Sequence, residues 1–83
     1  MQGGGQANAP THRLDVRGFR CPIPVGETRQ ALGGLERGHV LEVRFDDPEA
    51  LEDLPPMLAR HGHKMLSIEE IAGDWRMCIE VMM

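Results

Sequence analysis

One cysteine of the sequence, Cys21, stands where its neighbours could support nucleophilic chemistry. It is followed directly by Pro22 and, after one intervening residue, by Pro24; this spacing suits the first turn of a helix, where proline removes no internal hydrogen bond. Free backbone N–H groups at that helix start, together with the charges of Arg17 and Arg20, predict a pKa below the ~8.5 of a free cysteine thiol. The sequence therefore favours a reactive thiolate over a structural cysteine that fills a gap.

The second cysteine, Cys78, has no such setting. It lies in an alternating segment in which it shares a face with Arg76 and Glu80 rather than with the apolar residues. No helix start is predicted beside it, and the absence of a Cys-x-x-Cys pair argues against a dithiol site. We expect Cys78 to be an incidental thiol on the open face of a sheet. A redox switch that pairs it with Cys21 is disfavoured, because we place the two cysteines on opposite sides of that sheet.

Other polar clusters are better explained by structure than by metal binding. His61 and His63 flank Gly62, which is a plausible helix stop, and their spacing is poor for a zinc site. Asp47 is expected to cap a helix, and solvation explains the neighbouring Asp46. The sequence also lacks a Ser-His-Asp pattern and a glycine-rich phosphate loop. It therefore predicts no metal site.

Length and charge limit the classes of protein to which the chain can belong. Its 83 residues predict one domain, and 13 acidic against 9 basic side chains give a net charge of -4, the wrong sign for direct binding to nucleic acid. Its apolar runs are far shorter than the ~20 residues of a membrane-spanning helix, and its start lacks the charged and apolar regions of a signal peptide. We expect a soluble, cytoplasmic protein that contacts neither membrane nor nucleic acid.

The sequence pattern predicts a disordered tail over residues 1–11 and one domain over residues 12–83. Apolar residues alternate with charged ones from Arg13, which indicates a short strand. Beyond Cys21, apolar positions recur at helical spacing and then alternate again. The predicted elements are a helix from Pro24 to about Leu35, a strand Val40–Phe45, a helix after Asp47, a strand Lys64–Glu70, a turn Ala72–Asp74 and a strand Trp75–Val81.

Two consecutive prolines, Pro55 and Pro56, are expected to break the second helix or to restart it near Asp53. Each helix has one apolar stripe, so both must pack on the sheet. The element order predicts an α/β fold of the α+β type, a two-layer β-α-β-α-β-β sandwich with two helices on one face of a four-stranded mixed sheet. The first two strands should be parallel and joined by a right-handed crossover.

The segment Leu14-Asp15-x-x-Gly18-x-x-Cys21-Pro22-x-Pro24 resembles the opening signature of the TusA/SirA family of small sulfur-carrier proteins. Further landmarks of that family follow in the same order. They are Leu35-Glu36-x-Gly38, Asp46-Asp47-Pro48, Asp53-Leu54-Pro55 and Gly62-His63. The resemblance covers the chain from about Arg13 to Val81 and implies the same two-layer sandwich.

The resemblance also implies a function. Family members accept sulfane sulfur as a persulfide on the motif cysteine and pass it to a protein partner, so Cys21 would be the carrier in a sulfur carrier or sulfurtransferase. The implied partners are a desulfurase- or rhodanese-like sulfur donor and a sulfur-acceptor protein, and no metal or organic cofactor is needed. Arg17, Arg20, Pro22 and Pro24 are then the candidate residues for stabilising the thiolate or docking a partner.

Members of the family supply tRNA thiolation, molybdenum-cofactor maturation or the oxidation of inorganic sulfur. Ile23 occupies the variable position of the proline motif, where some members that serve tRNA thiolation carry glutamate, and Gly26 stands where an apolar residue is usual. An alternative from a different functional class is a non-catalytic regulatory or protein-interaction module of the same fold, in which Cys21 is dispensable.

Overall fold

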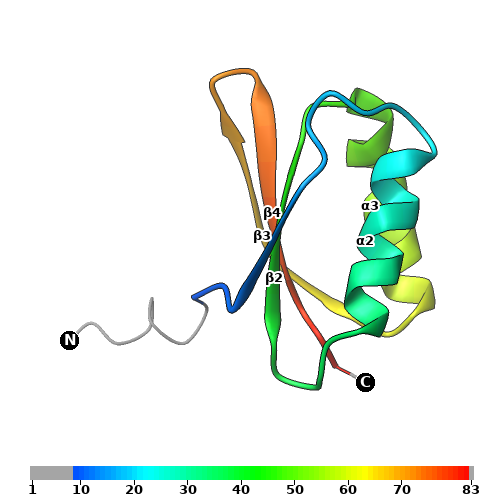
Figure 1. Cartoon of the computed structure of the whole chain (residues 1–83), viewed down its shortest axis with the longest axis vertical. Helices are drawn as coiled ribbons and strands as arrows, with labels where there is room; N and C mark the ends of the chain where they lie inside the picture. Colours follow the sequence, from blue (N-terminus) through cyan, green and yellow to red (C-terminus); the bar gives the residue numbers. More distant parts are fainter. Residues whose placement is uncertain (1–8, 83) are drawn as a thin grey trace.

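Two helices and four strands make up the part of the chain, residues 9–82, that the computed structural model describes (Figure 1). In chain order they are β1 (His12–Asp15), α2 (Ile23–Gly33), β2 (Val40–Phe45), α3 (Pro48–Arg60), β3 (Lys64–Ile71) and β4 (Asp74–Glu80). Each element agrees in type with its sequence prediction. Of the predicted tail, residues 1–8 lie outside the described residues.

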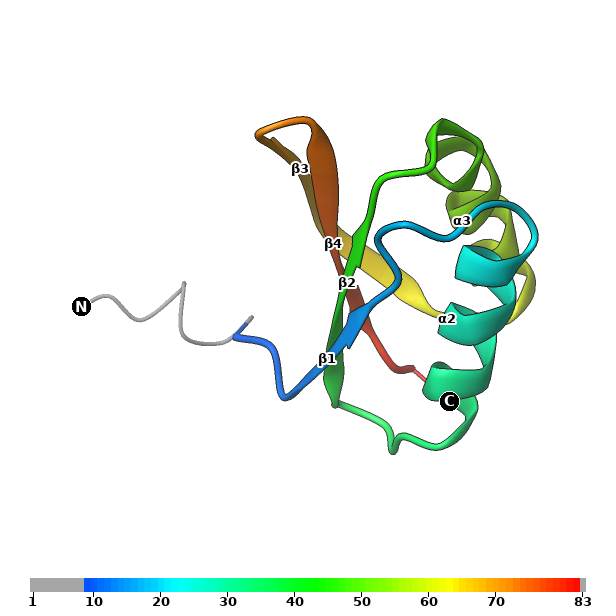
Figure 2. The ribbon, with the colours of Figure 1, turned by 45° about the horizontal axis from the view of Figure 1, so that its top comes forward.

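The strands form one mixed sheet in the order β1-β2-β4-β3. β1 runs parallel to β2, whereas β4 is antiparallel to both of its neighbours. Figures 1 and 2 show both helices on the same face of this sheet, with the other face left open. The predicted two-layer α+β sandwich is confirmed.

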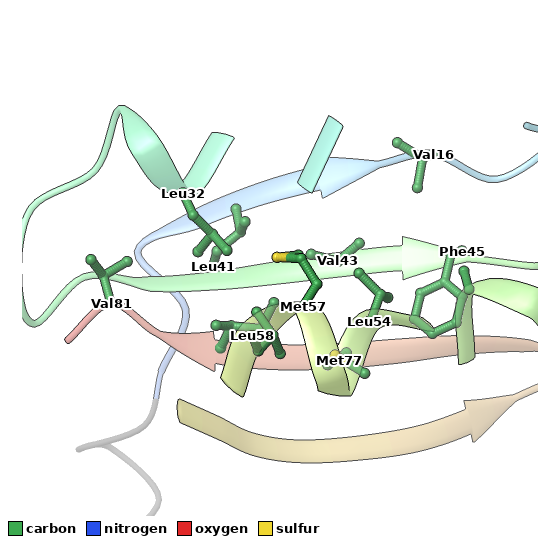
Figure 3. Close-up of a cluster of buried hydrophobic side chains, with 12 residues drawn as sticks. Val16, Leu32, Leu41, Val43, Phe45, Leu54, Met57, Leu58, Met77 and Val81 are labelled. Carbon is green, nitrogen blue, oxygen red and sulfur yellow. The ribbon is translucent and has the colours of Figure 1, made fainter. Parts of the chain in front are cut away.

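The core lies between the helices and the two central strands (Figure 3). Alternation in β2 and β4 directs one set of side chains toward the helices, and α3 contributes a stripe at helical spacing. The strand residues are Leu41, Val43, Phe45, Met77 and Ile79, and the helix residues are Leu32, Leu54, Met57 and Leu58, all of them buried. This shared core fixes both helices against the middle of the sheet.

The expected break at Pro55 and Pro56 is wrong, because α3 continues through both residues to Arg60. Neither proline can donate the backbone hydrogen bond of a helix interior. However, buried residues of the same stripe lie on both sides of the pair, Leu54 before it and Met57 after it. Packing of this stripe on the sheet keeps the helix continuous despite the local preference of proline.

Thr11, which was predicted to belong to the tail, pairs with β2. Its backbone N–H donates to the carbonyl oxygen of Val40 at 2.8 Å, and its Oγ1 accepts from the Val40 N–H at 2.9 Å. The hydroxyl thus takes the place of a backbone acceptor in the parallel ladder. Ordered pairing with β2 therefore begins one residue before β1.

We expect Leu54→Ala to lower the free energy of unfolding by about 3 kcal/mol, because the substitution removes apolar contacts and leaves a cavity in the core. Leu54 has no exposed surface, whereas Ile68 on β3 is 37% exposed and serves as the matched control. Ile68→Ala should cost about 1 kcal/mol or less. Urea denaturation followed by circular dichroism measures both changes, and equal losses would contradict the placement of the core.

Candidate functional site

Cys21 lies in the loop between β1 and α2, directly before the helix, and is exposed. The peptide bond between Cys21 and Pro22 is cis. Pro24 is buried in the first turn of α2, where its carbonyl oxygen accepts a hydrogen bond from Thr28 Oγ1 at 2.7 Å. The two prolines thus have different positions: Pro22 borders the cysteine at the surface, and Pro24 anchors the start of the helix in the interior.

A buried carboxylate, that of Asp47, holds Cys21 against the start of α3. Asp47 Oδ2 accepts a hydrogen bond from the Cys21 backbone N–H at 2.8 Å, and Oδ1 accepts from the Glu49 N–H at 3.2 Å. The predicted helix cap is therefore confirmed. The same side chain also joins two segments that are 26 residues apart in the sequence.

Asp46 holds the preceding part of the same loop. Its Oδ1 accepts hydrogen bonds from the Gly18 N–H at 2.9 Å and from Arg20 Nη1 at 3.1 Å. Gly18 has a φ of +90°, a conformation that other residues rarely adopt, so glycine suits this turn. The expectation that Asp46 is merely solvated is wrong, because its carboxylate fastens the loop that carries Cys21.

A groove of about 450 Å³ runs from Cys21 between α2 and α3. Its walls are formed by one face of each helix. The lining residues are Cys21, Pro22, Val25, Gly26, Arg29, Asp53, Pro56 and Arg60. A Cβ atom at Gly26 would meet nothing within 4 Å, so a larger residue there would enter the groove without striking the backbone.

The predicted lowering of the Cys21 pKa is wrong, because its surroundings raise the pKa of this thiol. Partial loss of hydration is the largest cause, although the residue is exposed. The negative charge of Glu49 follows, and the charges of Asp53 and Asp47 add to the same effect. The protonated thiol is therefore favoured in the free protein.

The two arginines that were expected to stabilise a thiolate have other partners. Arg17 pairs with Asp15 at 2.7 Å and with Asp74 at 3.6 Å, and these carboxylates lie toward the sheet. Arg20 pairs with Asp46 at 3.1 Å. Neither arginine is among the main causes of the shift in the Cys21 pKa. Closeness in the sequence did not predict which charges act on the thiol.

The side of the site that α3 provides was not predicted from the sequence, and neither was Arg29 on α2. A signal for both was present in the spacing. Pro22, Gly26 and Arg29 follow one another at helical intervals, as do the groove residues Asp53, Pro56 and Arg60. Each stripe combines charged residues with proline or glycine, so it lacks the apolar pattern that identifies a buried helix face.

Cys78 lies on the open face of the sheet, as predicted. Its cross-strand partners are Glu42 on β2 and Ser67 on β3. It also lines another surface pocket, together with Arg13 and Arg76. Both cysteines are free thiols. Among residues 9–82 no three His, Cys, Asp or Glu side chains are grouped so that they could hold a metal ion. Neither helix in this range has the length and apolar character to cross a membrane.

We expect alkylation of Cys21 by iodoacetamide to require a more alkaline pH in the folded protein than in a peptide of residues 18–24. The raised pKa keeps the thiol protonated at neutral pH, and iodoacetamide reacts with the thiolate. The measurement is the rate of modification against pH, by intact mass, in a Cys78→Ser background.

Asp53→Asn should move this pH profile toward that of the peptide, because it removes one negative charge near the thiol. Glu52→Gln is the matched control on the same helix, since Glu52 is not among the main causes of the shift in the Cys21 pKa. A profile for the folded protein that lies at lower pH than that of the peptide would contradict the electrostatic assignment.

Asp47→Ala should lower the free energy of unfolding by about 2 kcal/mol, because it removes the cap of α3 and leaves the Cys21 N–H without its acceptor. Urea denaturation measures this change. Glu52→Ala, at an exposed position of the same helix, should stay within about 0.5 kcal/mol of the wild type. Similar values for the two variants would show that Asp47 does not hold the loop.

Comparison with known proteins identifies the family. Residues 12–81 match the sequence model of a family described as sulfurtransferase TusA. A protein of Thermotoga maritima described as a "putative sulfur carrier protein" is 42% identical over 72 residues, which are 86% of this chain and 91% of that protein. YedF of Escherichia coli K12, with the same description, is 36% identical over 71 residues, or 86% of this chain and 92% of YedF.

A solved structure agrees with this assignment. The crystal structure of a SirA-like protein from Desulfitobacterium hafniense has a TM-score of 0.76 at 26% sequence identity, and the match covers 88% of this chain and 100% of that one. The family match spans both helices and all four strands described above. The chain therefore belongs to the TusA family.

Proposed function

We propose that this protein is a sulfur carrier that holds sulfane sulfur on Cys21 as a persulfide and relays it between two protein partners. The observation that carries the proposal is the exposed Cys21 thiol at the mouth of the α2–α3 groove in a member of the TusA family. The relatives described as sulfur carriers support the same role.

The transfer is a displacement at sulfur. The Cys21 sulfur attacks the terminal sulfur of a donor persulfide, R–S–SH, so that a bond forms between Cys21 and that sulfur and the bond to the donor breaks. The products are the Cys21 persulfide and the donor thiol, R–SH. No electrons are gained or lost overall, and the chemistry needs neither a metal ion nor an organic cofactor. Passage to the acceptor repeats the step with Cys21 as the donor.

The raised pKa of Cys21 suits a protein that must travel between partners. A protonated thiol reacts more slowly with oxidants and alkylating molecules than a thiolate does. The free carrier would thus be protected until a partner brings a sulfur atom close to Cys21 and orients it. We also propose a cytoplasmic location, where a reducing environment keeps such a cysteine free.

The docking surface that we propose surrounds Cys21 on the side of the helices. Phe19 and Ile23 flank the cysteine with 50% and 45% of their surfaces exposed, and Arg29 and Arg60 line the groove. Exposed apolar side chains beside positive charges fit protein partners, here a desulfurase- or rhodanese-like donor and an acceptor. The acceptor would belong to tRNA thiolation, molybdenum-cofactor maturation or inorganic sulfur oxidation.

We expect the wild-type protein to gain one sulfur atom on exposure to glutathione persulfide, and we expect a reductant to remove it. Cys21→Ser should fold normally and gain no sulfur, because the exposed cysteine contributes no buried packing. Intact mass after rapid desalting measures the gain, and circular dichroism checks the fold.

The matched control is Cys78→Ser, which removes the other thiol and should leave the sulfur gain unchanged. Sulfur gain by folded Cys21→Ser would overturn the proposal. If the wild type gains no sulfur from this donor or from a purified desulfurase, the protein-interaction module becomes the better description, and partner binding that survives Cys21→Ser would support it.

A further inference from the structure

The groove beside Cys21 contains three charged side chains, Arg29 from α2 and Asp53 and Arg60 from α3. Among residues 9–82, none of the three forms an ion pair. Most arginines elsewhere in that range are paired with a carboxylate, namely Arg13, Arg17, Arg20, Arg44 and Arg76. Although the chain has a net charge of -4, this groove therefore presents two guanidinium groups that have no carboxylate partner within the described residues.

The three charges have a defined order along the groove. Figures 1 and 2 show α2 and α3 side by side and running in the same direction, and Cys21 lies where both helices begin. Arg29 follows Pro22 by seven residues, and Arg60 follows Asp53 by seven, which is about 10 Å along each helix. Both arginines therefore lie further from the Cys21 end than the side chains that precede them on the same wall, and Asp53 lies between the thiol and Arg60.

A matching ligand has two negative charges, one positive charge and a sulfur atom that can reach the thiol. Glutathione persulfide has this composition, with two carboxylates, one ammonium group and the persulfide on its central residue. Arginine is well suited to binding carboxylates because its planar group donates two parallel hydrogen bonds. An extended tripeptide spans about 10 Å. The groove volume of about 450 Å³ lies in the range of small-molecule sites, about 300–1,000 Å³.

We propose that the α2–α3 groove binds glutathione persulfide, with Arg29 and Arg60 on its carboxylates and Asp53 on its ammonium group. This inference rests on the proposed persulfide function. The Cys21 sulfur forms a bond with the terminal sulfur of the bound donor, and the bond between that sulfur and the glutathione sulfur breaks. The proton of the Cys21 thiol passes through solvent to the glutathione thiolate, so the products are the Cys21 persulfide and glutathione. The carrier is thus loaded by a small molecule without a donor protein.

The test compares two donors on each variant, glutathione persulfide and the persulfide of 1-thioglycerol, which has neither a carboxylate nor an ammonium group. The ratio of their second-order rates of sulfur uptake, measured by intact mass, cancels any change in the reactivity of the thiol itself. For the wild type this ratio should exceed that of a peptide of residues 18–24 by about tenfold. Arg29→Gln and Arg60→Gln should each lower it by about threefold, and the double variant by about tenfold.

Arg37→Gln is the matched control. Arg37 is also exposed and forms no ion pair within the described residues, but it does not line the groove. Its substitution changes the net charge equally and should leave the donor ratio unchanged. An equal fall in this control would show that overall charge, rather than the groove, selects the donor, and the proposal would be wrong.

The role of Asp53 is tested with a third donor, N-acetylglutathione persulfide, which lacks the ammonium group. The wild type should take up sulfur from it about twofold more slowly than from glutathione persulfide. Asp53→Asn should accept the two donors at equal rates, because the charge that distinguishes them is absent. If this variant still prefers the donor with the ammonium group, the assignment of Asp53 is wrong.

Binding without sulfur transfer separates this proposal from the proposed function. S-methylglutathione has no transferable sulfur, and in Cys21→Ser it should shift the amide NMR signals of the groove residues, less so after Arg29→Gln. If the wild type gains sulfur but the donor ratio equals that of the peptide, the groove proposal fails and the carrier function stands. If the wild type gains no sulfur, these shifts decide whether the groove binds the tripeptide. If only an acetylated tetraglutamate peptide causes shifts, the groove binds an acidic protein segment instead, and the proposal is wrong.

Discussion

The geometry around Cys21 depends on the buried carboxylate of Asp47. This side chain caps α3 and accepts the Cys21 N–H, so it connects the end of β2, the start of α3 and the loop before α2. If either helix start moved, the buried carboxylate of Asp47 and a backbone N–H would lose their partners, which is costly because a buried carboxylate has little access to water. The cysteine, although exposed, is therefore held in a defined position.

This connection also determines the electrostatics of the site. By fixing the start of α3 beside Cys21, it places the charges of Glu49 and Asp53 near the thiol. Partial loss of hydration, together with these charges, raises the pKa of Cys21. The two arginines that precede Cys21 form ion pairs instead, Arg17 with Asp15 and Arg20 with Asp46. A thiol that stays protonated in the free protein and reacts when a donor sulfur is presented would suit the relay that we propose.

Packing of α3 on the sheet shapes the rest of the groove. The helix passes through Pro55 and Pro56 because the buried residues on both sides of them share one apolar stripe. Pro56 lies on the opposite side from that stripe and forms part of the groove wall, between Asp53 and Arg60. A break in the helix at the prolines would have separated these two side chains. The continuous helix instead aligns them along one wall, facing α2.

The sequence by itself determined the features that depend on near neighbours. Alternation identified β2 and β4, the Asp47–Pro48 pair identified the start of α3, and the prolines after Cys21 identified the start of α2. The order of these elements and their single apolar faces then led to the two-layer sandwich. Only the tertiary structure decided which charges face the thiol, because Glu49 and Asp53 come from a helix about 30 residues further along the chain. Coulombic interactions depend on distance in space, and local sequence patterns do not contain that distance.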